Sequence, residues 1–221
     1  MPFTFTPVGP VTAYQFPDDA SAGESAFLSV VSTGSELWLR AYALTLKPLA
    51  AALIARQKAG QLTHITVDRS CMVDDKAQKA LVDSLVAAGL EVTVTTSYAG
   101  KEYIAHEKTA VDADGLVFTG STNWSESAWR QINKSLAFRS PEFVQQFVAS
   151  FNTSVAYAWK NEREYQLMAE PPANITQSDL TDPVPDTAES VQADAEVWAN
   201  EGGAPRSRRK TSTDNESTTE E

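Results

Sequence analysis

Three strand-like runs alternate with two helix-like runs in the first half of the chain, and this order constrains the fold more than any other feature. Apolar residues recur with period two in the strand-like runs and with a helical period in the others. Glycine follows each helix-like run, at Gly60 and Gly89, where it commonly ends a helix. The strand-like runs are 36–45, 62–68 and 91–96, and the helix-like runs are 47–59 and 74–88. We therefore expect an α/β fold with a mixed, mainly parallel sheet and helices on both faces.

Further elements are expected on either side of this core. An edge strand is expected at 11–16, and Ser21 with Glu24 matches a capping box, which predicts a helix over 22–32. A DADG turn near residue 113 predicts a hairpin between the run around residue 106 and the run 115–119. The remaining predictions are a loop or short helix at 125–133, a strand at 134–139 and a helix at 141–159.

Composition divides the chain into a lead-in at 1–20, a domain at 21–168 and a tail at 169–221. From Glu170 onward there are 12 acidic and 4 basic residues, so this part accounts for −8 of the formal net charge of −11. Its richness in Pro, Ser, Thr and acids predicts a disordered tail. The near-neutral remainder does not exclude a phosphodiester substrate. The basic run at 206–210 is interpreted as a solvated charge cluster, in preference to a nucleic-acid contact or an address signal.

The chain has one cysteine, Cys71, which excludes an internal disulfide and suits a reducing compartment, so we expect a cytoplasmic protein. The first ten residues lack a basic and an apolar region, and no apolar run reaches membrane-spanning length. We therefore expect no secretory signal and no membrane insertion. Two histidines and one cysteine without clustered spacing predict neither a metal site nor a cofactor.

Candidate chemistry gathers between residues 103 and 133. His106 and Lys108 are spaced two apart in a run that we interpret as a strand, so their side chains share one face. Ser121 and Asn123 follow in a Gly-Ser turn. An ammonium group, a hydroxyl, a carboxamide and backbone N–H groups suit a tetrahedral anion, and an imidazole can attack it or carry a proton.

HEK at 106–108 followed by GSTN at 120–123 resembles the HxK…GSxN motif of the phospholipase D superfamily, and the resemblance extends over about residues 20–160. It implies that His106 attacks phosphorus while Lys108, Ser121 and Asn123 hold the phosphoryl oxygens. The family's reaction uses two histidines, one from each of two motifs. Because this chain has one motif, the resemblance implies a homodimer through the motif face. A short chain with a single motif looks more like the nucleases of the family than the lipases, and this resemblance implies a nucleic-acid substrate.

The sequence departs from the family motif at two positions. Ala113 stands where the family has an aspartate, flanked by Asp112 and Asp114. Ser135 stands two residues after Asn133, where the family often has an acid.

Other polar residues of the chain were also weighed for the site. Asp68 ends a strand, at the sheet edge where open α/β sheets build their sites, and is a secondary candidate with Asp112, Asp114 and Asn133. Arg40 shares a strand face with Tyr42, near the same edge, and His64 is interpreted as structural.

Three functions remain open. The preferred hypothesis is a metal-independent phosphodiesterase, specifically a nuclease that works through a phosphohistidine in a composite dimer site. A non-catalytic binding or assembly module with the same fold is the second, and a phospholipid or small-molecule phosphodiester hydrolase is the third.

Overall fold

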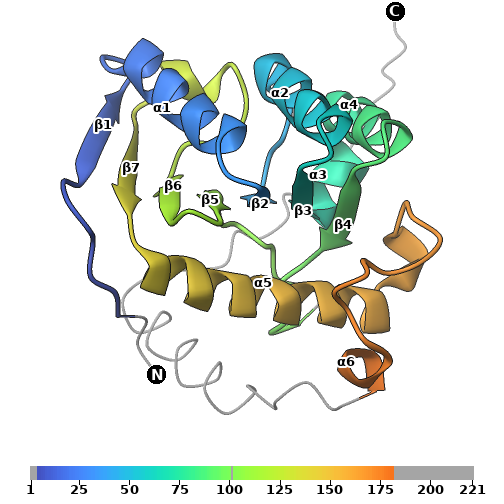
Figure 1. Ribbon diagram of the computed structural model, residues 1–221. Coiled ribbons are helices and arrows are strands. Elements are labelled where there is room, and N and C mark those ends of the chain that lie inside the picture. Colours follow the sequence, from blue (N-terminus) through green and yellow to red (C-terminus); the bar gives the residue numbers. More distant parts are fainter. Residues whose placement is uncertain (1–3, 101, 182–221) are drawn as a thin grey trace, which may run out of the picture. The chain divides into compact units, whose positions relative to one another are not determined.

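The computed structural model describes residues 4–100 and 102–181, which form one mixed β-sheet between two layers of helices (Figure 1). The strands are β1 (Thr12–Phe16), β2 (Glu36–Ala41), β3 (Leu62–Asp68), β4 (Glu91–Thr95), β5 (Thr109–Asp112), β6 (Leu116–Gly120) and β7 (Asn133–Arg139). The α-helices are α1 (Ala20–Ser32), α2 (Lys47–Lys58), α3 (Arg69–Asp74), α4 (Lys76–Ala87), α5 (Pro141–Asn161) and α6 (Gln177–Thr181). Two 3₁₀ turns, η1 (Ala128–Arg130) and η2 (Arg163–Tyr165), complete the described elements.

The sheet has the strand order β1-β7-β6-β5-β2-β3-β4. Only β2, β3 and β4 pair in parallel, and the other four pairings of the described strands are antiparallel. The expectation of a mainly parallel sheet was therefore wrong in this detail. The cause lies in the connections, because α2 and α4 join parallel neighbours whereas the tight 113–115 turn can join only an antiparallel hairpin. The α/β class, the mixed sheet and the predicted hairpin are confirmed.

Helices cover both faces of the sheet, as predicted (Figure 1). One apolar core lies on the side of α1, α2 and α4, and it includes the inward faces of β2 and β3. The second core lies under α5, whose Phe143, Phe147 and Phe151 pack on the opposite face. Trp124 and Trp129 both belong to the first core. Trp124 is fully buried and stacks on Phe27 with ring centroids 4.2 Å apart. Trp124 and Trp129 thus pack beneath the motif loop and do not cover it.

Local signals placed most element ends within a few residues. The predicted helix over 74–88 is α4, which begins at Lys76 because Asp75 takes an extended conformation and its carboxylate caps the helix by accepting from the N–H groups of Ala77 and Gln78. The predicted capping box at Ser21 is wrong: α1 begins at Ala20, two residues before the predicted start, and Asp19 precedes it without a side-chain cap.

The packed region continues beyond residue 168, where sequence composition placed the start of the tail. Ile175 is buried in the core under α5, and Met168 and Leu180 pack against the same core. The Gln166 side-chain amide also bonds both the N–H and the C=O of Val94, at 3.0 and 2.8 Å, along the outer edge of β4. The apolar contacts of Met168, Ile175 and Leu180 explain why this largely polar segment folds back on the sheet. The rest of the predicted tail, 182–221, including the basic run at 206–210, lies outside the described residues.

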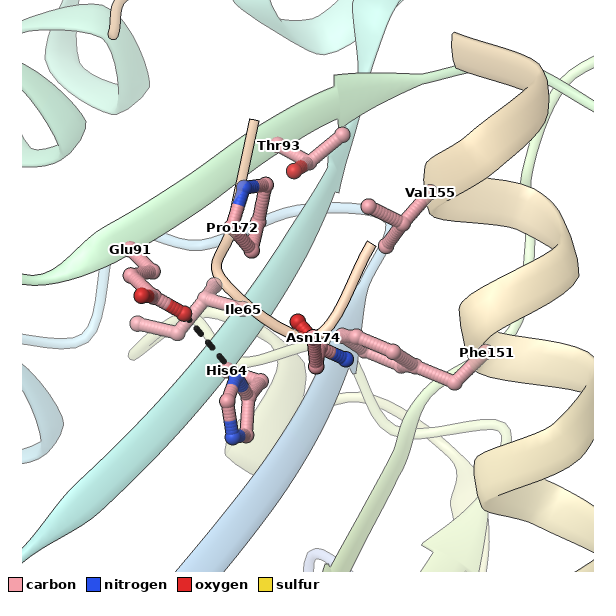
Figure 2. A pocket seen from close by; sticks show the side chains of 8 residues that line it. All are labelled: His64, Ile65, Glu91, Thr93, Phe151, Val155, Pro172 and Asn174. Carbon is pink, nitrogen blue, oxygen red and sulfur yellow. Dashed lines mark hydrogen bonds and ion pairs between the residues drawn. The ribbon is translucent and has the colours of Figure 1, made fainter. Parts of the chain in front are cut away.

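His64 lies in this part of the molecule and lines a small pocket together with Pro172 and Asn174 (Figure 2). Its ring nitrogens are 3.0 Å from a Glu91 carboxylate oxygen and 2.9 Å from one of Glu36. Although burial disfavours its charged form, the hydrogen bonds to Glu91 and Glu36 raise the pKa of His64 above its usual value. Its neighbours therefore give it a structural environment that joins β2, β3 and β4.

Candidate active site

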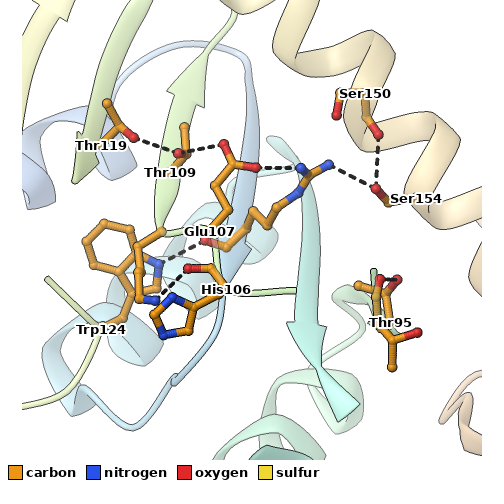
Figure 3. A network of polar contacts seen from close by, with 11 residues as sticks. Thr95, His106, Glu107, Thr109, Thr119, Trp124, Ser150 and Ser154 are labelled. Carbon is orange, nitrogen blue, oxygen red and sulfur yellow. Dashed lines mark hydrogen bonds and ion pairs between the residues drawn. The ribbon is translucent and has the colours of Figure 1, made fainter. Parts of the chain in front are cut away.

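His106 and Lys108 lie in an extended segment just before β5, which begins at Thr109. The expectation that this segment forms a strand was therefore wrong, since these residues have no ladder partner. The alternation of side chains still holds. His106 points to one side, while Glu107 points toward α5 on the other (Figure 3).

Side-chain contacts hold this segment in place of ladder hydrogen bonds. The buried Asp68 carboxylate accepts from the N–H of Ala105 at 2.6 Å, and it also accepts from the N–H of Ser70. On the other side, the Arg40 guanidinium pairs with Glu107 at 2.5 Å and donates to Ser154 Oγ at 3.2 Å (Figure 3). The residues on either side of His106 are thus fixed by separate anchors. Asp68 lies beside the site, where the C-terminal end of β3 was expected to bring it.

Lys108 is a nearly buried cation. It is 3% exposed, and its Nζ donates to the His106 carbonyl oxygen at 2.5 Å and lies 4.8 Å from the centroid of the Tyr42 ring. No described carboxylate lies within ion-pair distance of this ammonium. Burial lowers the pKa of Lys108 to about 8, although Cys71 and Asp68 oppose the shift. A buried ammonium without a carboxylate partner is suited to an incoming anion.

The His106 side chain is exposed beside this ammonium. Its ring lies edge-on to Tyr42, with centroids 4.5 Å apart. Burial of part of the ring and the nearby Lys108 charge lower the pKa of His106, with Asp68 acting in the opposite direction. The imidazole is therefore favoured in its neutral form, in which a ring nitrogen can act as a nucleophile.

The Gly-Ser turn after β6 approaches the same segment. The N–H of Gly120 donates to the Lys108 carbonyl oxygen at 3.3 Å, and a Cβ on Gly120 would clash with the Lys134 carbonyl oxygen. Trp124 then fixes the loop, since its carbonyl oxygen accepts from the N–H groups of Thr45 and Leu46 at 2.9 Å. This pairing holds the GSTN turn against the chain that leaves β2.

The two turn residues predicted to bind phosphate differ in their contacts. The Ser121 hydroxyl bonds the backbone of Lys134 and the Asn133 side chain, at 3.0 and 3.1 Å, so it is already engaged. Asn123 is half-buried, and its amide oxygen is buried without a hydrogen-bond partner among the described residues. Because the two ends of an amide can exchange by rotation, this unmatched group is available to a ligand.

The remaining sequence candidates have structural contacts. Asp112 is fully buried in the hairpin, where it accepts from the N–H of Leu116 at 2.8 Å and from the Thr33 hydroxyl at 3.0 Å. Asp114 lies in the turn itself, at the end of β5 remote from His106. These two secondary candidates are therefore not brought to the site.

Asn133 and Ser135 lie on β7, next to the motif turn. Asn133 holds Ser121 and donates to the Ala128 carbonyl oxygen at 2.9 Å. Ser135 is buried opposite Gly120 and donates to Thr122 Oγ1 at 2.9 Å. A hydroxyl pair thus fills the place that an acid often occupies in the family.

Glu107 was missed by sequence reasoning, because it occupies the variable position of the motif. The same two-residue alternation that groups His106 with Lys108 assigns Glu107 to the opposite side, where Arg40 lies, and this was the available signal. Arg40 and Tyr42 both reach the motif segment, but on opposite sides of it, because Arg40 pairs with Glu107 and the Tyr42 ring packs on His106.

Residues 30–155 match the family model described as "Cardiolipin synthase, PLD-like domain", which is more than half of the chain. This chain belongs to the PLD-like domain family. No curated protein matches its sequence significantly. Among solved structures, the PLD-like domain is similar to the phospholipase D family member Nuc from Salmonella typhimurium, with a TM-score of 0.58 and 20% identity over 66% of this chain and 93% of that chain. It is also similar to NucT from Helicobacter pylori, with a TM-score of 0.59 and 19% identity over 66% of this chain and 94% of that chain. At this identity the two structures show a shared fold.

The described residues of the PLD-like domain contain no group of three or more His, Cys, Asp or Glu side chains that could hold a metal ion. Across the same residues, no helix combines the length and the apolar character needed to cross a membrane.

Proposed function

We propose that this PLD-like domain is a metal-independent phosphodiesterase that cleaves nucleic acid through a phosphohistidine intermediate. The observation that carries the proposal is Lys108, a buried ammonium without a carboxylate partner among the described residues, directly beside an exposed neutral imidazole. Such a pairing supplies a fixed positive charge and a nucleophile at one point. The fold shared with Nuc and NucT supports a phosphodiester substrate.

In the first step, a ring nitrogen of His106 attacks phosphorus, so that a P–N bond forms and one P–O ester bond breaks. Lys108 and Asn123 stabilise the negative charge on the phosphoryl oxygens, which is greatest in the transition state. A second histidine, which enters this step in its protonated form, gives its proton to the leaving oxygen. Water then attacks phosphorus, the P–N bond breaks, and the proton of the water passes to the second histidine.

The second histidine is His106 of another copy of the chain, because the motif occurs once in the sequence. In a two-fold dimer identical surfaces meet at the axis, so the two exposed imidazoles face each other across it. Each site is then completed by both copies, and the homodimer forms through the motif face.

The test is to incubate purified protein in EDTA with labelled single- and double-stranded DNA, RNA and phospholipid, beside His106→Asn. We expect wild-type protein to cleave nucleic acid without added metal and the variant to lose turnover. Cleavage that requires restored magnesium or zinc would contradict the mechanism. Cleavage of phospholipid alone would assign the domain to lipid chemistry.

The second candidate is a non-catalytic binding module, and one observation favours it. No described carboxylate hydrogen-bonds to the His106 ring, and Ser135 fills the place of the acid that often accompanies this motif. If no phosphodiester is cleaved and His106→Asn binds nucleic acid as tightly as wild-type protein, this second function replaces the first.

A further inference from the structure

We propose that a polar pocket beside His106 binds one nucleobase of the substrate, on the 5′ or 3′ side of the cleaved bond. This inference rests on the proposed nuclease function and adds a substrate-binding role for pocket residues that, apart from His106, the mechanism does not use. The pocket lies between the motif segment, the loop after β4 and helix α5.

His106 and Glu107 form one wall of the pocket, and Thr95 and Ser154 lie across from them (Figure 3). Its volume is about 180 Å³. This is well below the roughly 300 Å³ at which pockets begin to hold a whole drug-sized ligand. The pocket therefore suits a single ring-sized group of a larger substrate, and His106, which lines it, links it to the proposed site of cleavage.

The charges of the pocket exclude a second phosphate site. Its one cation, among the described residues that line it, is Arg40, and Glu107 already pairs with that guanidinium at 2.5 Å. Lys108, by contrast, has no carboxylate partner in the described structure and does not line the pocket. The anion is therefore expected at Lys108, and a neutral polar group is expected in the pocket.

Hydroxyl groups give the pocket its capacity for hydrogen bonding. Thr95 Oγ1 donates to the Thr96 carbonyl oxygen at 2.9 Å, and Ser154 Oγ donates to the Ser150 carbonyl oxygen at 3.1 Å. The Thr95 hydroxyl keeps its lone pairs to accept from a ligand, and Ser154, which also accepts from Arg40 at 3.2 Å, keeps one. The Ser97 hydroxyl, which accepts from the N–H of Ala99 at 3.2 Å, keeps its own proton to donate. A nucleobase carries both donors and acceptors along its edge and matches such a lining.

The rim of the pocket offers an aromatic surface. Tyr98 is 38% exposed and Ile104 is 46% exposed, and both line the opening. An exposed tyrosine beside a polar floor allows a base to stack by its face while its edge reaches the hydroxyl groups. Saturated groups would gain little from this rim, which favours a base over a polyol.

The experiment uses four fluorescent DNA dinucleotides: one with both bases, one lacking the 5′ base, one lacking the 3′ base and one lacking both. Wild-type protein is compared with Tyr98→Ala and with Tyr165→Ala, a control of matched exposure (37%) outside the pocket. We expect removal of one particular base to lower kcat/KM about 10-fold, as stacking energies imply. Tyr98→Ala should show a similar loss on the full substrate and little further loss when that base is absent. Tyr165→Ala should behave as wild type.

Equal cleavage of all four substrates by wild-type protein would overturn the inference, as would an equal loss for Tyr98→Ala on every substrate. Binding of the same dinucleotides to His106→Asn, followed by NMR titration, separates the two proposals. If wild-type protein cleaves nothing but one base still strengthens binding, the nuclease function fails and the pocket assignment stands. If neither cleavage nor binding depends on a base, the pocket assignment fails.

Discussion

Lys108 combines the functional role proposed for it with a cost to folding. An ammonium that is 3% exposed and lacks a carboxylate partner among the described residues loses much of its hydration. Its pKa of about 8 in the folded protein lies below the ordinary value of 10.5, so the unfolded chain binds more protons between these two pH values. The free energy of unfolding is therefore expected to rise with pH over that interval. An anion bound beside this ammonium would offset the cost.

The same pKa predicts a pH profile of activity. The lysine must be protonated to stabilise the phosphoryl oxygens, so kcat/KM should decline above a pH of about 8. Lys108→Arg keeps its charge at higher pH and should remove this decline, even if the overall rate is lower. An alkaline limb that is unchanged in Lys108→Arg would show that another group titrates there.

Arg40 is a positioning residue whose removal should affect the rate more than substrate binding. Arg40→Met keeps an aliphatic side chain against Phe147 but frees Glu107, and we expect kcat to fall about 10-fold or more through misplacement of His106. The double variant Arg40→Met with Glu107→Gln should be no slower than the single variant, because both remove one interaction. Additive losses, or a change confined to KM, would contradict this role.

Among single residues, the motif candidates could be chosen from the sequence, whereas the contacts that hold them in place could not. Spacing and residue type identify His106, Lys108 and Asn123, because these properties are written in the sequence. The anchor between Arg40 and Glu107 spans 67 residues, so it depends on the sheet order that brings β2 beside β5. The role of Asp112 could not be predicted either. Its place in the sequence resembles that of a motif aspartate, but its carboxylate accepts a hydrogen bond within the hairpin.

Among the elements, the segment after α5 stabilises the domain through a few apolar side chains. Ile175 is 7% exposed in the core under α5. Ile175→Ala should lower the free energy of unfolding by about 2–4 kcal/mol, measured by urea denaturation. The nearby Asn174→Ala, at an exposed position, serves as the control and should change stability little. A negligible effect of Ile175→Ala would place the boundary of the folded domain back near residue 168.

Element positions were largely predictable and pairing directions only in part. The strand over 62–68 and the helix over 47–59 follow from apolar period and from glycine stops. The segment at 169–181 was assigned to the tail because composition averages over many residues, whereas its packing depends on single side chains such as Ile175. The antiparallel pairing of β5, β6 and β7 follows from the short connections between them. Hydrophobic periodicity locates a strand but does not show which strand it pairs with or in which direction.

For the whole molecule, the central expectation is a dimer that joins the two motif faces. Light scattering should give twice the chain mass at micromolar concentration, because in the proposed mechanism a second imidazole completes each site. Mixing inactive His106→Asn with wild-type protein in excess should lower the activity per wild-type chain, since mixed dimers lack one histidine. A monomer that retains full activity would contradict the composite site.

The most direct test of the account is to trap the covalent intermediate. Wild-type protein is mixed with a labelled oligonucleotide in EDTA, denatured rapidly in alkali to preserve phosphohistidine, and analysed by mass spectrometry of its peptides. We predict a nucleotide adduct on the peptide that contains His106, and no adduct in His106→Asn. Cleavage without any adduct on His106, or an adduct that persists in His106→Asn, would contradict the proposed mechanism.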